Sequence, residues 1–113
     1  MANSVPPSKV DTSLAALPPT ERERLTLYGA RLLLTEMQGR LVLATREVAR
    51  FETKYDTTLT RLDEIGLPDD ANLETHEDYV EWSGWQATVD ETSQTLEILR
   101  SILEATHAAP PTG

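Results

Sequence analysis

The fold is decided by residues 20–55, which read TERERLTLYGARLLLTEMQGRLVLATREVARFETKY. Apolar residues recur in this stretch at alternating spacings of three and four over about four heptads, which is the period of a helix that packs along one seam. We place the start of this helix at Thr20, because Thr20 and Glu23 have the spacing of a capping box. The seam residues are Leu27, Ala30, Leu34, Met37, Leu41, Ala44, Val48, Phe51 and Tyr55.

A second seam of the same spacing follows in the C-terminal part of the chain. We expect its helix to begin at Thr75, with Asp78 as the capping partner. Between the two long helices the sequence predicts a short helix over Thr58–Ile65, capped by Thr57 and stopped by Gly66. The second seam consists of Trp82, Trp85, Val89, Thr92, Leu96, Leu99 and Leu103.

The two seams are about equally long, so the helices can fold back on each other as a hairpin. One antiparallel register pairs residues whose numbers add to about 130, such as Leu34 with Leu96, from one end of the seams to the other. The prediction is an all-α fold, a long coiled-coil-like hairpin over residues 19–107. Prolines flank this region, so residues 1–18 are expected to be a flexible arm and residues 108–113 a disordered tail.

The first long helix carries a second apolar stripe on the side opposite the hairpin seam. A helix that is apolar nearly all round is normally buried all round, and a two-helix hairpin covers only one side. We therefore expect a partner chain or a second copy on this face, with dimerisation completing a four-helix bundle. Gly29 and Gly39 suit close approach of that neighbour. The stripe consists of Leu25, Tyr28, Leu32, Thr35, Gly39 and Val42, widened by Leu33 and Leu43.

Charge and composition exclude several classes of function. The chain of 113 residues has a net charge of −9, and residues 57–78 hold one basic and seven acidic side chains. This balance argues against direct binding of nucleic acid, which uses clustered Lys and Arg. No apolar run is long enough for a membrane span, and no signal-peptide pattern is expected at the start. Because the chain has no cysteine, we expect a cytoplasmic protein.

The residue patterns favour a protein without catalytic, cofactor-binding or metal-binding residues. Glu104 and His107 have a Glu-x-x-His spacing, but the first helix offers no carboxylates near them for a di-metal site. Arg100 and His107 match the loose spacing of a class of helical ribonucleases, although the chain has too few helices for that fold. His76 lies among acidic residues that a helix start explains equally well. The prediction is that the chain is not an enzyme.

Most of the aromatic residues are predicted to gather where the short helix joins the two long ones. We expect them to form a small core that closes the hairpin, since aromatic side chains dominate core burial. The alternative is a recognition pocket at this end, with Trp85 beside Gly84 as the residue that stays partly exposed. The gathered residues are Phe51, Tyr55, Tyr79, Trp82 and Trp85.

Three segments around this end resemble a family of small helical prokaryotic proteins. They are Arg50-Phe51-Glu52-Thr53-Lys54-Tyr55, the following Leu59-Thr60-Arg61-Leu62, and His76-Glu77-Asp78-Tyr79-Val80-Glu81-Trp82. The family pattern is Phe-Glu-x-Lys-Tyr-Gly followed by Asp-x-x-Glu-Trp, and the match covers about residues 48–86. Asp56 stands where the pattern has a helix-ending glycine. Such proteins are commonly encoded beside small toxins and are considered antitoxins.

The resemblance implies a non-enzymatic neutraliser that binds a basic toxin, for instance a ribonuclease. An acidic surface would steer association with such a partner. Two other hypotheses stay open at this point: a structural homo-oligomer, and an acidic mimic of nucleic acid that inhibits a DNA-binding enzyme. The acidic residues concerned are Asp63, Glu64, Asp69, Asp70, Glu74, Glu77, Asp78 and Glu81. The predicted recognition end consists of Asp69, Asp70, Glu74, Asp78 and Trp85.

Overall fold

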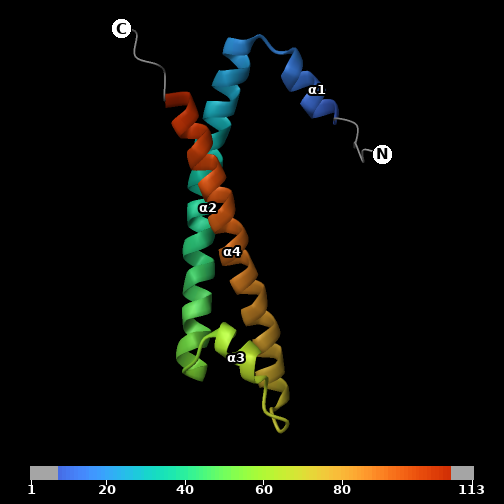
Figure 1. Cartoon of the computed structure of the whole chain (residues 1–113), viewed down its shortest axis with the longest axis vertical. Helices are drawn as coiled ribbons and strands as arrows, with labels where there is room; N and C mark the ends of the chain where they lie inside the picture. Colours follow the sequence, from blue (N-terminus) through green and yellow to red (C-terminus); the bar gives the residue numbers. More distant parts are fainter. Residues whose placement is uncertain (1–7, 108–113) are drawn as a thin grey trace.

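The computed structural model describes residues 8–107, and the elements in this range are all helices (Figure 1). They are α1 (Lys9–Ala16), α2 (Pro19–Tyr55), α3 (Leu59–Ile65) and α4 (Leu73–His107). The predicted all-α class is confirmed. Within this range no helix has an apolar stretch that could cross a membrane.

The two long helices, α2 and α4, lie side by side and antiparallel over most of their length (Figure 1). The residues of both predicted seams are buried or half-buried between them. One cluster, with Ala30, Met37, Leu96 and Leu99, lies toward the chain ends, and a second surrounds Trp82 near α3. The long helical hairpin predicted from the spacing is therefore confirmed.

The register of the hairpin agrees with the prediction to within three residues. Phe51 stacks on Trp82, and Arg50 pairs with Glu81. The numbers in these pairs add to 133 and 131, against the predicted value of about 130. The predicted register placed Trp82 opposite Val48. In the structure it lies closer to the level of Phe51, on whose ring the indole stacks.

The long helices begin elsewhere than the capping patterns predicted. α2 begins at Pro19, and its N-cap, Pro18, makes no side-chain hydrogen bond, so the predicted capping box at Thr20 was wrong. Proline fits the first helical position because the N–H it lacks would be unpaired there in any case. α4 begins at Leu73, two residues before the predicted start. Asn72 Oδ1 accepts from the Thr75 backbone N–H at 2.9 Å and satisfies one free donor of the first turn.

The segment between α2 and α3 contains a left-handed residue that is not glycine. Asp56 ends α2 with φ 51° and ψ 44°, so aspartate takes the helix-ending role itself. α3 is capped by Thr58, whose side chain accepts from the Arg61 N–H at 3.2 Å, and not by the predicted Thr57. Gly66 ends α3 with φ 77°, as predicted.

The helix α1 lies inside the region predicted to be a flexible arm. Ser8 and Asp11 form a capping box at its start, and none of its residues is buried. In Figure 1 α1 points away from the α2–α4 pair. Residues 1–7 of the predicted arm and the predicted tail, 108–113, lie outside the described residues, and the flexibility of the arm stays a prediction.

Candidate functional site

The aromatic residues near α3 form a packed core, as the sequence predicted. Trp82 and Phe51 are completely buried, and their rings stack at 5.8 Å between centroids. Tyr55 stacks on the indole as well, at 5.9 Å. The buried Trp82 Nε1 has no hydrogen-bond partner among the described residues. We call this end of the hairpin, where α3 joins α2 to α4, the connection end.

A cavity of about 390 Å³ lies beside this core. It is bordered mainly by apolar residues of α3 and of the α3–α4 connection, such as Leu62, Leu67 and Pro68, and by Trp82. The sequence offered a recognition pocket at this end as an alternative, with Trp85 as its partly exposed residue, but Trp85 does not border this cavity. Its binding of a ligand stays a prediction.

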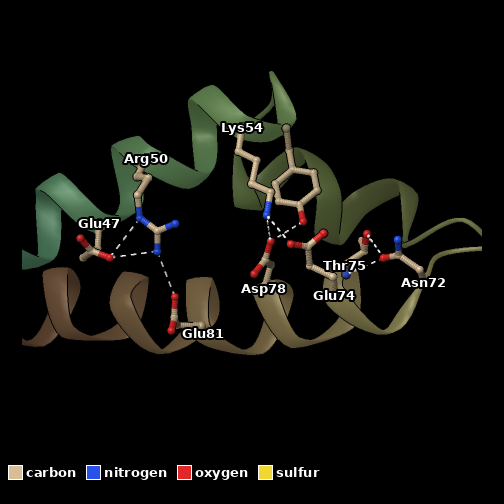
Figure 2. Close-up of polar contacts among 9 residues, drawn as sticks. Glu47, Arg50, Lys54, Asn72, Glu74, Thr75, Asp78 and Glu81 are labelled. Atoms are coloured by element: carbon tan, nitrogen blue, oxygen red, sulfur yellow. Dashed lines mark hydrogen bonds and ion pairs between the residues drawn. The ribbon is translucent and has the colours of Figure 1, made fainter.

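A cluster of charged side chains joins α2 to α4 across the surface of the connection end (Figure 2). Arg50 pairs with Glu47 on its own helix at 3.0 Å and with Glu81 on α4 at 3.1 Å, and its guanidinium lies 4.3 Å from the centre of the Phe51 ring. Lys54 Nζ lies 2.5 Å from an Asp78 carboxylate oxygen. The polar cluster consists of Glu47, Arg50, Lys54, Tyr55, Glu74, Asp78 and Glu81.

Asp78 is the shared acceptor of Lys54 and Tyr55 in this polar cluster. Its carboxylate accepts hydrogen bonds from Lys54 and from the Tyr55 hydroxyl, both at 2.5 Å. The bond from Lys54, and then that from Tyr55, holds the pKa of Asp78 below its ordinary value. The same bond raises the pKa of Lys54, while burial raises that of Tyr55. The cluster therefore fixes α4 against α2 with Asp78 ionised.

Replacing Asp78 by asparagine should destabilise the hairpin at neutral pH but not in acid. The folded pKa is lowered, so the carboxylate contributes stability above its ordinary pKa of 3.8, and that contribution is lost as the pH falls through the lowered pKa. Urea midpoints measured between pH 7 and pH 2.5 should separate wild type from Asp78→Asn at pH 7, and should begin to approach each other as the pH falls below about 4. Asp70→Asn is the control, because the exposed Asp70 side chain makes no ion pair among the described residues. A constant gap across the pH range would contradict the role of the charge.

The structure divides the predicted recognition end into two parts. Asp69 and Asp70 are exposed in the connection between α3 and α4, whereas Glu74 and Asp78 face Lys54 in the polar cluster. Trp85 is half-buried and packs beside the aromatic core. Sequence reasoning missed Arg50 and Lys54 as partners of α4. The available signal was the register, which places these two bases within a turn of Glu81 and Asp78.

The second apolar stripe of α2 lies on the surface of the hairpin. Its large side chains are between 45% and 72% exposed, with Leu32 the most exposed. Gly39, within the stripe, is exposed as well. We call this surface the outer face of α2. It consists of the predicted interface residues Leu25, Tyr28, Leu32, Gly39 and Val42, together with Thr35. The other two residues of the predicted stripe, Leu33 and Leu43, are exposed but border grooves between α2 and α4.

Within residues 8–107 no three histidine, cysteine or carboxylate side chains lie together as metal ligands would. His76 is exposed near the start of α4. The side chain of His107, which the sequence offered as a partner of Glu104 or Arg100, lies outside the described part of the chain.

Comparisons of this chain with protein families, with curated proteins and with solved structures found no match. The resemblance to antitoxin-like proteins therefore stays an expectation from the sequence.

Proposed function

We propose that this chain is a cytoplasmic, non-enzymatic protein-binding module. The observation that carries the proposal is the outer face of α2. Its large apolar side chains are exposed on one side of a helix whose other side is already packed on α4. Contiguous apolar surface of this kind marks interaction sites in proteins, whereas scattered exposed apolar residues do not. A second protein chain on this face would bury it.

The connection end supports a basic protein as one partner. Glu74, Asp78 and Glu81 are already paired with the two bases of the polar cluster. The remaining carboxylates of this end have exposed side chains without an ion pair among the described residues, and they would steer a basic surface toward it. These carboxylates are Asp63, which accepts a hydrogen bond from the Tyr79 hydroxyl, and Glu64, Asp69, Asp70 and Glu77. Neutralisation of a small basic toxin by this end, in the manner of an antitoxin, is the function we propose.

The second candidate is a structural homo-oligomer assembled through the outer face of α2. The same apolar stripe favours it, because two hairpins joined there would give an assembly of four long helices. The two candidates use different surfaces, so one chain can combine both.

Reversing three free charges at the connection end should slow capture of a basic partner. We expect Asp69→Lys, Asp70→Lys and Glu77→Lys together to lower the association rate by about tenfold or more at low salt, with the dissociation rate nearly unchanged. The measurement is the binding rate of the basic protein that co-purifies with the tagged wild-type chain from its host. Glu74 and Asp78 are left intact, so that the hairpin stays closed.

The matched control reverses three carboxylates elsewhere on α4. Asp90→Lys, Glu97→Lys and Glu104→Lys change the net charge by the same amount, and these residues are exposed along α4 away from the connection end. We expect this control to affect the association rate much less. Equal effects of the two triple variants would show that only net charge matters and would remove the connection end as the recognition surface.

A further inference from the structure

Gly39 occupies a place on the outer face of α2 where the hairpin itself does not require glycine. Apart from the adjacent residues and the nearby backbone of α2 itself, no atom of the described residues lies within 4 Å of the position that a Cβ would take at Gly39 or at Gly29. Both residues have helical backbone, where alanine is much the stronger helix former. The described hairpin would therefore accept alanine at both positions. A neighbour that packs closely against the helix backbone would not.

The spacing of the outer face allows a second copy to pack on it in the opposite direction. Its central residues follow steps of three, four, three, four and three, which read the same from either end. In an antiparallel pair, each of these residues would therefore lie opposite one residue of the partner's outer face, in successive layers as in a coiled coil. The two-fold axis would pass between residues 33 and 34, so the same surface would serve both subunits. These central residues are Leu25, Tyr28, Leu32, Thr35, Gly39 and Val42.

In this register large residues meet small ones. The half-exposed ring of Tyr28 would lie against the partner's Gly39, and the symmetry makes this contact twice. Leu25 would face the partner's Val42, and Leu32 the partner's Thr35. A tyrosine ring can pack directly on the helix backbone where the partner residue is glycine. Glycine at position 39 would therefore be required in the dimer, although the single hairpin does not require it.

The charges at the two ends of the stripe favour the same direction. One step beyond the apolar residues, Glu21 would face the partner's Arg46. Both side chains are exposed, and the ion pair that Glu21 makes within its own helix, with Arg24, is a long one at 3.7 Å on the surface. A parallel pair would instead place Glu21 against the partner's Glu21 and Arg46 against the partner's Arg46. Like charges at both ends disfavour that arrangement.

We propose that the outer face of α2 binds a second copy of this chain in an antiparallel, two-fold arrangement, with Tyr28 packed on the partner's Gly39. The inference rests on the proposed function, because it names the occupant of the protein-binding face. The two α2 helices would form the middle of a flat layer of four helices with each α4 outside, in place of the four-helix bundle expected from the sequence. The two connection ends would point in opposite directions, which leaves both acidic surfaces free for a basic partner.

Gly39→Ala should weaken the dimer without destabilising the hairpin. We expect it to raise the thermal midpoint of the dilute chain, because alanine favours the helix, and to weaken dimerisation about tenfold or more in sedimentation equilibrium, because the methyl group displaces the tyrosine ring. Gly84→Ala is the matched control, since Gly84 is exposed in the middle of α4 and also has open space at its Cβ position. It should raise the midpoint and leave dimerisation unchanged. Unchanged dimerisation in Gly39→Ala would overturn the proposed contact.

A charge-reversal pair tests the direction independently. Glu21→Arg alone should weaken the dimer, and adding Arg46→Glu should restore it. The two residues are about 37 Å apart along one helix, so the second change cannot compensate for the first within a chain. Failure of the second reversal to restore dimerisation would overturn the antiparallel register.

Spin labels give the geometry directly. The chain has no cysteine, so Ala49→Cys on the exposed side of α2 would carry the only label. The antiparallel pair predicts a separation of about 45 Å between the two labels, whereas a parallel pair would bring them within about 20 Å. A short distance would overturn the register. A chain that stays monomeric at every concentration would overturn the second copy as occupant, while capture of a basic protein would still support the proposed function.

Discussion

Trp82→Ala should lower the free energy of unfolding by about 3–5 kcal/mol, the cost of removing a large aromatic side chain from a core. Trp82 is completely enclosed, and its indole stacks on both Phe51 and Tyr55. Alanine would leave a cavity between α2, α3 and α4 that these rings cannot fill without moving. Urea unfolding followed by circular dichroism measures the loss, since it does not depend on tryptophan fluorescence.

Two further variants show whether the loss comes from burial at this position. Trp85→Ala makes the same change three residues later, where the side chain is only half-buried, and should cost clearly less. Trp82→Phe should also cost less, because a ring stays in the stack and the unpaired N–H is removed. Equal losses in Trp82→Ala and Trp85→Ala would contradict the central place of Trp82.

Ala44→Asp should open the hairpin, with an expected loss of at least about 3 kcal/mol. Ala44 has no exposed surface and lies in the seam between the two buried clusters. A carboxylate there would lose its water on entering the seam. The measurement is again the urea midpoint, together with the hydrodynamic radius, which should grow as α4 separates from α2.

An exposed alanine in the next turn of α2 provides the control for this substitution. Ala49 lies on the surface of the same helix, so Ala49→Asp changes helix propensity and charge in the same way without entering the seam. It should cost less than about 1 kcal/mol when measured on the dilute chain. Similar losses at both positions would mean that the contact of α2 with α4 contributes little to stability.

The seam shows how much of the fold follows from local pattern. The positions of Ala30, Met37 and Ala44 in a three-four repeat were sufficient to predict which side of α2 is buried. The starts of the long helices were predicted less well. Thr20 and Glu23 have the capping-box spacing, but α2 already begins at Pro19, so Thr20 lies inside the helix. In α4, Asn72 is the capping residue and Thr75 lies within the first turn. Several caps compete within a few residues at small differences in free energy, so spacing alone does not choose between them.

Of the two candidate surfaces, one follows from local pattern and the other depends on how the helices pack. The outer face of α2 could be predicted because exposure on a hairpin follows from helix periodicity once the seam is known. For the polar cluster the predicted register reaches only to within a turn of the correct partners, although most of the acids of the cluster were on the predicted list. Pairing of Lys54 with Asp78 and Glu74 depends on how far one helix slides and turns against the other. A shift of one residue along the axis, about 1.5 Å, is enough to change partners.

The class of the fold, the two seams, the antiparallel hairpin and the apolar stripe left outside it all follow from the sequence alone. These follow from periodicity, which each helix carries locally. The packed structure was needed to show that Trp82 stacks on both Phe51 and Tyr55, and that Asp78 and Glu74 pair with Lys54. These depend on the offset between α2 and α4. That offset is set by the packing of whole side chains from both helices at once, and no single stretch of sequence contains it.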